Sequence, residues 1–459
     1  MPTSIPTAQP TAIAMPIPTR INGFHGEIRI PGDKSISHRS LMFSALVNGT
    51  STVHGLLPSA DVLSTLGCLQ QLGQRITPID EANGHWCIEG QARWSEPNTW
   101  LDCGNSGTTM RLMAGLIAGQ SIFATLSGDV SLNKRPMGRV LQPLASMGAN
   151  AYGRNQNRLA PLCFVPSPTG LTAIHYTMPV ASAQVKSAIL LAGLYAEGTT
   201  VVTEPLPSRD HTERMLTAMG AALTTDEQGG IHVQGNALEH LHPMEWLVPS
   251  DPSSAAFMMV MATLCPNAEV LLKNVGLNPH RTGLFEALKR MGANITVENE
   301  RVIGGEPVGD VLVRSAELAG DLSLEAVDIP ALVDEIPILA VAAVYLQGTL
   351  TVHGADELRK KESDRLLAMQ TELAKVGINV TLFEDGLQLT GNPDACLPTE
   401  ATSVINTWHD HRIAMAMASL NVIHNARQPQ QACQWLLDDT AVVAVSFPSF
   451  FDDVQRLAR

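Results

Sequence analysis

The sequence has few aromatic and few charged residues. Of its 459 residues, 4% are aromatic and 16% are charged, while 45% are hydrophobic. A chain this apolar is not intrinsically disordered, and aliphatic side chains and methionine must fill its core. No apolar run reaches the roughly 18 residues needed to span a bilayer, so we expect no membrane-spanning segment. At about 150 residues per domain, the length indicates two or three domains.

Positive charge is also scarce, with 30 Lys and Arg against 44 Asp and Glu, a net charge of −14. Such a chain is repelled by the phosphates of nucleic acids and of anionic membranes, and we expect neither as a partner. The seven cysteines show no CxxC or zinc-binding spacing, which is typical of free thiols in a reducing compartment. Walker A and dinucleotide-binding glycine motifs are absent too, and we expect no cofactor.

The first 18 residues are uncharged and rich in Thr, Pro and Ala. A signal peptide has a basic start and an unbroken apolar stretch, which Pro16 and Pro18 interrupt here. A transit peptide would carry arginines. We therefore expect residues 1–18 to be a flexible tail on a cytoplasmic protein.

One pattern recurs six times along the chain: a polar cluster, an apolar run, a glycine and a β-branched segment. The clusters are centred 69 to 81 residues apart, on Lys34, Asn105, Gln184, Ser253, Asp334 and His411. A second pattern, Leu-x-x-apolar-Gly, lies between the centres at residues 69–73, 144–148, 216–220, 288–292 and 373–377. Apolar residues three apart, closed by glycine before a β-branched run, indicate helix, cap and strand. Each unit is thus predicted as strand–helix–strand–helix–strand, and the fold class as α/β (α+β).

The first helix of each unit is apolar on nearly all sides, which predicts that it lies inside its domain. The unpaired N–H groups and the dipole at a helix N-terminus attract anions. The scarce cations lie near these N-termini: Lys34, Arg39, Arg111, Arg135, Lys186, Arg209, Lys361, Arg365 and Arg412. A lone Lys or Arg is usually a solvated surface charge, but repetition at one place in the architecture indicates an anion site.

Two acidic or imidazole motifs have simpler interpretations. The pair Asp334 and Glu335 is of a type that often only caps a helix. His409 and His411 resemble a metal-binding pair, but no third ligand cluster is evident, and we expect no metal.

Six strings together resemble one known family. Residues 31–39 read PGDKSISHR, 104–108 GNSGT and 134–139 KRPMGR, while 334–335 read DE, 361–365 KESDR and 410–412 DHR. Over residues 20 to 455, the chain resembles the 5-enolpyruvylshikimate-3-phosphate synthase family. The resemblance implies a two-domain inside-out α/β barrel of six βαβαββ pseudo-repeats, three per domain, with helices packed inside. We expect one domain over 32–248 and the other over 19–31 plus 249–459, because a strand before residue 31 can join the second half and the chain crosses again near Pro249.

The resemblance also implies the reaction. The family transfers the enolpyruvyl group of phosphoenolpyruvate to the 5-hydroxyl of shikimate 3-phosphate by addition and elimination, in the shikimate pathway to chorismate and aromatic amino acids. By resemblance, shikimate 3-phosphate is bound by Lys34, Ser35, Arg39, Ser182, Gln184, Ser208, Arg209, Asp334 and Lys361. The matches for phosphoenolpyruvate are Lys34, Gly107, Arg135, Gln184, Arg365 and Arg412, with Lys361 also near it. Both substrates carry a phosphate and a carboxylate, the charges that the cation clusters suit.

Asp334 matches the family's proton acceptor at the hydroxyl. A carboxylate ringed by Arg and Lys has a low pKa, so we expect it to be ionised at neutral pH. Glu362 and Lys34 are the candidate acids toward the methylene carbon, with His411 assisting, and the sequence leaves the choice open. Gly107 leaves room in the phosphoenolpyruvate pocket, which predicts inhibition by glyphosate in competition with phosphoenolpyruvate.

Some positions depart from the family pattern. Ser446 stands where many members carry Lys, His38 replaces a frequent Asn, and Ser106 a frequent Ala. The alternative function is that of UDP-N-acetylglucosamine enolpyruvyl transferase, which shares architecture and donor but uses a loop cysteine that has no counterpart here. A non-catalytic anion-binding protein would not need Asp334, Glu362 and His411 together. We expect a monomer whose partners are the two small-molecule substrates.

Overall fold

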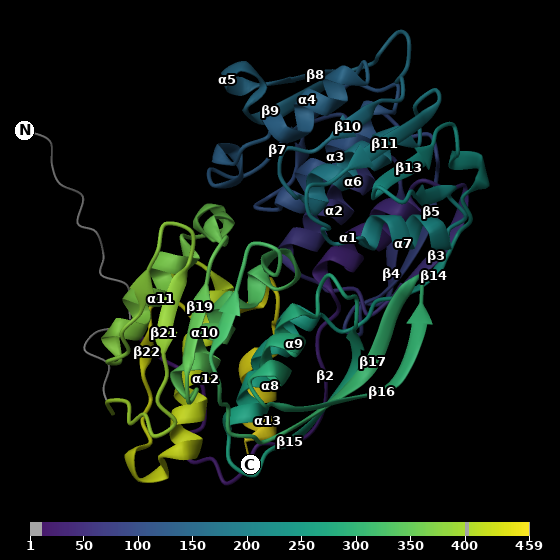
Figure 1. Cartoon of the computed structure of the whole chain (residues 1–459). Helices are drawn as coiled ribbons and strands as arrows, with labels where there is room; N and C mark the ends of the chain where they lie inside the picture. Colours follow the sequence, from purple (N-terminus) through teal and green to yellow (C-terminus); the bar gives the residue numbers. More distant parts are fainter. Residues whose placement is uncertain (1–11, 400–403, 459) are drawn as a thin grey trace, which may run out of the picture.

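The computed structural model describes residues 12–399 and 404–458, which form repeated units of sheet and helix. Figure 1 shows two bodies, one coloured purple to teal and the other mostly teal-green to yellow, with one purple segment from near the N-terminus. One hydrophobic cluster takes its residues from 36–248, and a second takes them from 15–30 and 255–458. None of the helices in the described part of the chain is both long and apolar enough to cross a membrane.

The first body contains three four-stranded sheets. The first sheet has the order β14 (Glu245–Leu247), β3 (Gly49–His54), β5 (His85–Gly90) and β4 (Arg75–Asp80). The second has the order β6 (Leu101–Asp102), β7 (Ala124–Ser127), β9 (Leu159–Val165) and β8 (Asn150–Gly153). The third has the order β10 (His175–Thr177), β11 (Thr199–Thr203), β13 (Gly230–Gln234) and β12 (Leu223–Thr225). In each sheet the first pair is parallel and the others are antiparallel, so the three units share one topology.

The second body repeats this topology twice. One sheet has the order β2 (His25–Arg29), β15 (Glu269–Gly276), β17 (Glu306–Arg314) and β16 (Asn294–Ile303). The next has the order β18 (Leu322–Leu324), β19 (Thr349–Val352), β21 (Leu387–Thr390) and β20 (Thr381–Leu382). The strand expected before residue 31 is β2, and it pairs parallel with β15. The sixth unit is reduced, because its sheet among the described residues is the antiparallel pair β1 (Ile13–Ala14) and β22 (Leu436–Leu437).

The prediction that the first helix of each unit lies inside is confirmed. These helices are α1 (Lys34–Ser44), α3 (Gly107–Ala118), α6 (Ala183–Gly193), α8 (Pro252–Leu264), α10 (Ile336–Val344) and α12 (His411–Arg427). Every residue of α8 and α10 is buried. α10 packs on α8 and α12, and α3 packs on α6. A helix that is apolar on all sides is stable only where other elements cover every face and keep it from water.

The second helix of each unit buries one face only. These helices are α2 (Ala60–Gln71), α4 (Gly138–Ser146), α7 (His211–Ala218), α9 (Gly283–Arg290), α11 (Arg365–Lys375) and α13 (Phe450–Leu457). Five of them carry the Leu-x-x-apolar-Gly pattern. The sixth, α13, has no such pattern, so the sequence predicted a second helix in this unit without giving its location. The short α5 (Arg154–Asn157) is a turn with left-handed residues inside it.

The prediction of a flexible tail over residues 1–18 is wrong for its last part. Residues 1–11 lie outside the described residues. Ile13 and Ala14 pair with β22, and the side chain of Met15 is fully buried in the same hydrophobic cluster as β2. The amide of Met15 also donates to the carbonyl of Trp435 at 3.1 Å. Apolar residues between the prolines therefore bind this segment to the second body.

Two chain segments link the bodies, and they lie side by side. The amide of Asp33 donates to the carbonyl of Pro249 at 2.8 Å, and the amide of Asp251 donates to that of Pro31 at 2.9 Å. Each segment ends in a helix cap: Asp33 accepts from the amide of Ile36 at the start of α1, and Asp251 caps α8. The inner helices of the two bodies thus begin from one junction.

Candidate active site

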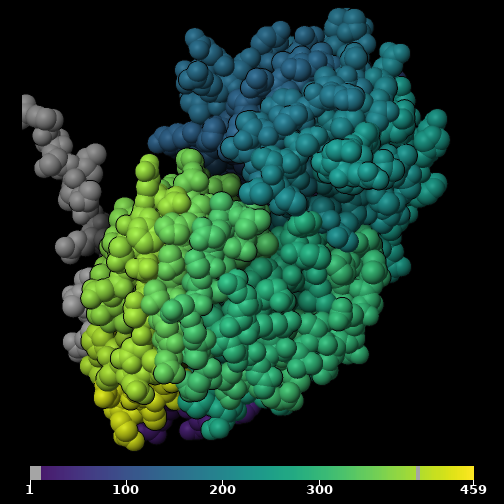
Figure 2. All heavy atoms as spheres, in the orientation of Figure 1, coloured from purple at the N-terminus to yellow at the C-terminus, as the bar shows by residue number. Residues whose placement is uncertain are grey.

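A cavity of about 730 Å³ lies between the two bodies, and Figure 2 shows the surface hollowed where the blue and green parts meet. One wall comes from the first body and the other from the second, with the lining Asp129, Val130, Ser131, Lys134, Arg135, Pro136, Lys360 and Lys361. This volume suits two small metabolites. Four of the eight lining residues are cations, so the cleft attracts anions in spite of the negative net charge of the chain.

Asp334 lies in a single 3₁₀ turn (Val333–Glu335) before α10, surrounded by cations. Its Oδ2 is 2.7 Å from Nη2 of Arg209, and its Oδ1 is 3.1 Å from Nη1 of Arg365 and 3.6 Å from Nζ of Lys361. Burial disfavours the carboxylate, but Lys361 and the arginines outweigh it and hold the pKa of Asp334 well below its usual range. The expectation that Asp334 is ionised is confirmed, and Arg209 brings a cation to it from the other body.

The first turns of α11 and α12 bring a second group of charges to the cleft. Arg365 is buried, with Nη2 2.7 Å from Oε2 of Glu362 and Nε 2.8 Å from Oδ2 of Asp410. Nη1 of Arg412 donates to the backbone carbonyl of Asp334 at 2.9 Å. The sequence strings KESDR and DHR are therefore joined through Arg365, and Arg412 joins them to Asp334.

At neutral pH neither Glu362 nor His411 is in its acidic form in this arrangement, which would be a carboxylic acid or an imidazolium. Burial alone would raise the pKa of Glu362, but the charge of Arg365 lowers it far below the usual value. Burial and the charge of Lys34 lower the pKa of His411 to about 3, so its imidazole is neutral. The positive charge of Lys34 contributes to lowering the pKa values of both Glu362 and His411.

The first body supplies Lys34, Gln184 and the glycine loop. Nζ of Lys34 is 3.2 Å from Oδ2 of Asp61 on α2, a partner that the sequence analysis did not identify. Nε2 of Gln184 donates to Oγ1 of Thr108 at 2.9 Å, and its Oε1 accepts from Arg111. Gly107 begins α3 in the same loop, which brings α3 and the start of α6 together at the cleft.

Arg135, from the wall of the cleft, donates to Oδ1 of Asn105 in the glycine loop. A Cβ atom at Gly107 would lie 2.7 Å from Nη1 of Arg111 and 3.5 Å from Nη1 of Arg135. The absence of a side chain at Gly107 therefore lets two guanidinium groups approach the helix N-terminus closely.

Other predicted residues are bound to protein partners within the first body. Arg39 is buried and donates to Oγ1 of Thr212 at 2.8 Å, to Oγ of Ser187 at 2.9 Å and to the carbonyl of Ser35 at 3.0 Å. Ser182 caps α6, with its hydroxyl accepting from the amide of Val185. Arg39 thus holds Ser35 and the starts of α6 and α7 together.

The prediction that Lys186 belongs to the anion-attracting cations is wrong. Its side chain is only 1% exposed, and its Nζ lies 2.7 Å from both Oε2 of Glu204 and Oε1 of Glu213. Two carboxylates neutralise it, so it has no charge left for a substrate. No spacing in the sequence shows that these carboxylates, 18 and 27 residues away, fold onto it.

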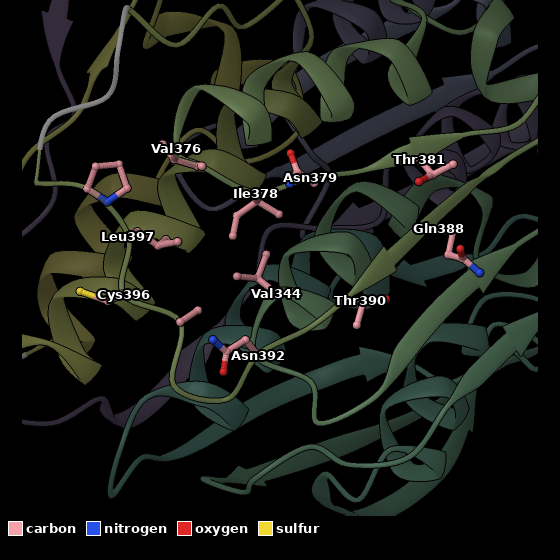
Figure 3. Close-up of a pocket in the computed structure, with 13 residues that line it drawn as sticks. Val344, Val376, Ile378, Asn379, Thr381, Gln388, Thr390, Asn392, Cys396 and Leu397 are labelled. Atoms are coloured by element: carbon pink, nitrogen blue, oxygen red, sulfur yellow. The ribbon is translucent and has the colours of Figure 1, made fainter.

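A second cavity, of about 540 Å³, lies in the second body (Figure 3). It has no charged lining residue, and its walls include Val344, Val376, Ile378, Asn379, Thr381, Gln388, Thr390, Asn392, Cys396 and Leu397. A pocket without cations is less suited to phosphates and carboxylates than the cleft between the bodies, which is therefore the candidate anion site. Within residues 12–399 and 404–458, no group of three or more His, Cys, Asp or Glu side chains is arranged to hold a metal ion.

His38, one of the departures from the family pattern, lies next to Arg39 on α1 and is fully buried. Its Nδ1 is 2.7 Å from Oγ1 of Thr65, and its Nε2 has no hydrogen-bond partner among the described residues. Burial lowers its pKa to about 3. In the unfolded chain a histidine titrates near 6.5. Above pH 6.5, His38 is neutral in both the folded and the unfolded chain and causes no pH-dependent loss of stability. As the pH falls from 6.5 toward 3, only the unfolded chain takes up the proton, so the free energy of unfolding falls.

We predict that His38→Asn makes the protein less sensitive to acid. Below pH 6.5 the unfolded chain takes up a proton that the folded chain excludes, at a cost of about 1.4 kcal/mol per pH unit. Between pH 6.5 and 5 the wild type should lose about 2 kcal/mol more of its unfolding free energy than His38→Asn. Urea unfolding at both pH values measures this, with His242→Asn at an exposed position as the control. Equal pH dependence in His38→Asn and wild type would contradict the prediction.

Comparison with known proteins agrees with the geometry of the cleft. Residues 18–454 match the family model described as EPSP synthase (3-phosphoshikimate 1-carboxyvinyltransferase). A 3-phosphoshikimate 1-carboxyvinyltransferase from Synechocystis sp. is 47% identical over 436 residues, covering 95% of this chain and 94% of the relative. One from Syntrophomonas wolfei is 45% identical over 432 residues, covering 94% and 97%.

Solved structures give the same result. An EPSP synthase from Acinetobacter baumannii superposes with a TM-score of 0.85 at 40% identity, covering 97% of this chain and 98% of that one. The enolpyruvyl transferase NikO from Streptomyces tendae has a TM-score of 0.75 at 16% identity and shares the fold alone. The chain has the two-domain inside-out α/β fold of these structures, and it belongs to the EPSP synthase (3-phosphoshikimate 1-carboxyvinyltransferase) family.

Proposed function

We propose that the cleft holds phosphoenolpyruvate and shikimate 3-phosphate side by side and that the residues facing it catalyse the reaction between them. The chain transfers the enolpyruvyl group to the 5-hydroxyl of shikimate 3-phosphate and releases phosphate, the reaction of its family. The observation that carries the assignment of the site is Asp334, an ionised carboxylate between Arg209 of one body and Arg365 of the other. A base held among cations suits substrates that bring several negative charges.

Shikimate 3-phosphate binds, in this proposal, mainly to the first body. Its phosphate and carboxylate meet the starts of α1, α6 and α7, with Asp334 and Lys361 from the second body reaching its ring. The set is Lys34, Ser35, Arg39, Ser182, Gln184, Arg209, Asp334 and Lys361, and Ser208, which the sequence also indicated, precedes Arg209 with its own polar atoms bound within the protein. Helix N-termini together with Arg and Lys give such anions both N–H donors and charge.

Phosphoenolpyruvate binds between the bodies, where the glycine loop faces α11 and α12. We assign to it Lys34, Gly107, Arg135, Gln184, Arg365 and Arg412. The guanidinium groups recognise its carboxylate and phosphate bidentately, and the backbone at Gly107 allows close approach. Cations from both bodies on one ligand would draw the two walls of the cleft together.

The proton transfers follow from the charge states of the site. Asp334 accepts the proton of the 5-hydroxyl as that oxygen attacks the central carbon of phosphoenolpyruvate. The ammonium group of Lys34 donates a proton to the methylene carbon, because Glu362 is ionised and His411 is neutral. The product of this addition is a tetrahedral ketal phosphate. In the elimination, Lys34 takes a proton back from the methyl group as the C–O bond to phosphate breaks, and the proton held by Asp334 passes to the leaving phosphate, which restores the carboxylate.

An assay of phosphate release tests the function. The protein should release phosphate from phosphoenolpyruvate when shikimate 3-phosphate is present and not when UDP-N-acetylglucosamine replaces it. The curated relatives and the absence of cysteine among the lining residues of the cleft favour the first acceptor. Release with the UDP-sugar alone would overturn the proposal in favour of the other enolpyruvyl transferase.

We predict that Gly107→Ala weakens the binding of both phosphoenolpyruvate and glyphosate. The added methyl would lie 2.7 Å from Nη1 of Arg111, so that guanidinium group, which is hydrogen-bonded to Gln184, must move. Displacing a packed group costs about 1–3 kcal/mol, so KM for phosphoenolpyruvate should rise about tenfold. The inhibition constant for glyphosate, measured in competition with phosphoenolpyruvate, should rise at least as much. Gly67→Ala on α2, where a Cβ atom meets nothing within 4 Å, is the control. An unchanged KM in Gly107→Ala would contradict the close packing.

We also infer that the protein acts as a monomer in the cytoplasm. Every residue assigned to the site comes from one chain. The described cysteines are free, in keeping with a reducing compartment.

A further inference from the structure

The segment between β11 and α7 carries Ser208 and Arg209, and it is anchored at one residue. The hydroxyl and the amide of Ser208 both donate to the carboxylate of Glu204, the amide at 3.3 Å. The carbonyl of Ser208 accepts from Nζ of Lys186 at 3.3 Å. Every polar atom of Ser208 is therefore bound to either Glu204 or Lys186.

The anchor is a buried cluster of charges. Two carboxylates face one lysine, so the cluster carries one more negative charge than positive charge. The side chains of Lys186, Glu204 and Glu213 are 1%, 7% and 14% exposed, and both carboxylates lie 2.7 Å from Nζ. Burial opposes the charge of Lys186, but Glu213 and Glu204 raise its pKa above the ordinary value. Buried ion clusters cost desolvation energy and are weak evidence for stability, so their presence requires another explanation.

The two carboxylates differ in what else they touch. Glu204 binds Lys186 and also the amide and hydroxyl of Ser208. Glu213, on α7, lies beside the same ammonium group, and its carboxylate makes no hydrogen bond to Ser208 in the described structure. The charge of Lys186 is thus shared between two carboxylates, while only Glu204 connects it to the loop.

The residue after the anchor reaches the reaction site. Nη2 of Arg209 is 2.7 Å from Oδ2 of Asp334. Because the only proton of the Ser208 hydroxyl goes to Glu204, that hydroxyl cannot also donate to a substrate phosphate. Ser208 therefore contributes to the site by fixing the backbone from which Arg209 extends.

We propose that Glu204 and Lys186 are positioning residues, which hold Ser208 and so direct Arg209 toward shikimate 3-phosphate. This inference rests on the proposed function, in which Arg209 binds that substrate. A side chain displaced by even 1 Å loses much of its contribution to binding and catalysis. Fixing Ser208, one residue before Arg209, therefore controls the affinity for shikimate 3-phosphate. Neither residue itself touches the substrate.

The test compares Glu204→Gln with Glu213→Gln. Each removes one negative charge at 2.7 Å from Lys186, but only Glu204→Gln disturbs the bonds to Ser208. Isothermal titration with shikimate 3-phosphate should show about 10- to 100-fold weaker binding for Glu204→Gln, and less than about threefold for Glu213→Gln. KM for phosphoenolpyruvate should change by less than about threefold in both.

A double-mutant cycle separates positioning from general stability. In an Arg209→Ala background, Glu204→Gln should cause no further loss of affinity, because the side chain that it directs is gone. Ser208→Ala, which leaves all three charges in place, repeats the cycle if Glu204→Gln does not fold. Equal losses in Glu204→Gln and Glu213→Gln, or an additive loss in the Arg209→Ala background, would overturn the inference. A wild type that neither binds shikimate 3-phosphate nor releases phosphate would instead refute the proposed function.

Discussion

Replacing Asp334 with asparagine should lower kcat by about 10² to 10⁴-fold, the usual loss when a general base is removed. Asparagine preserves the shape, and its single carbonyl oxygen can still accept from either Arg209 or Arg365, but it cannot take the proton of the 5-hydroxyl. Phosphate release at saturating concentrations of both substrates measures kcat. Because the pKa of Asp334 is held well below its usual range, the wild type should keep this base ionised throughout pH 5 to 8.

The neighbouring carboxyl supplies the control. Glu335 is more deeply buried than Asp334, and burial together with the charge of Asp334 raises its pKa, whereas the pKa of Asp334 is lowered. Its Oε2 has no hydrogen-bond partner among the described residues. Glu335→Gln should therefore change kcat by less than about tenfold. If Asp334→Asn keeps more than a tenth of the wild-type kcat, or Glu335→Gln loses as much, Asp334 is not the base.

The architecture was predictable because each repeat has a local pattern of apolar residues and glycines in the sequence. α10 and α8 are apolar on all sides, and only burial suits such a helix. The outer helices are marked by Leu-x-x-apolar-Gly in five units. The strand β1 and the location of α13 were not predicted, for different reasons. β1 is only two residues long and lies between prolines, and α13 does not end in a glycine cap. Their structure depends on tertiary contacts with the second body, which no local pattern records.

The sequence predicted the cations of the site and the carboxylates within its motifs, Asp334 and Glu362, but not the carboxylates that come from other segments. Motifs identified Lys34, Arg365 and Arg412, but the partners that set their charge balance come from distant segments. Asp61 reaches Lys34 from α2, and Glu204 and Glu213 neutralise Lys186. Such pairs form across the fold at no fixed spacing, so the sequence showed where cations gather but not which of them remain free for substrate.

The largest effect on stability should come from Arg281, which lies at the junction of the two bodies. Nη1 of Arg281 is 2.8 Å from Oδ2 of Asp33, and Nη2 is 2.8 Å from Oδ1 of Asp251. These two carboxylates cap α1 and α8, the inner helices that start from the crossover segments. Nη1 also lies 3.2 Å from Nε2 of His211 at the start of α7. One guanidinium group thus joins three helix N-termini from both bodies.

We predict that Arg281→Ala lowers the free energy of unfolding by about 3–5 kcal/mol, because it leaves two buried carboxylates without a counter-ion. Arg314→Ala is the matched control. Its Nε is 2.7 Å from Oε2 of Glu269, but these side chains are 45% and 55% exposed, so its loss should be about 0–1 kcal/mol. Urea unfolding of both variants and the wild type measures the difference.

The pH dependence identifies the cause of the loss. With Arg281 present, burial alone would raise the pKa of Asp33, but the guanidinium group lowers it to about 2. Without Arg281, burial should raise the pKa of Asp33 above the value in the unfolded chain and should raise that of Asp251, which burial and Asp33 already raise, further still, so the folded variant takes up protons first as the pH falls. The gap in stability between wild type and Arg281→Ala should therefore be widest at pH 8 and narrower at pH 5. A gap independent of pH would mean that lost packing, and not unpaired buried charge, explains the destabilisation.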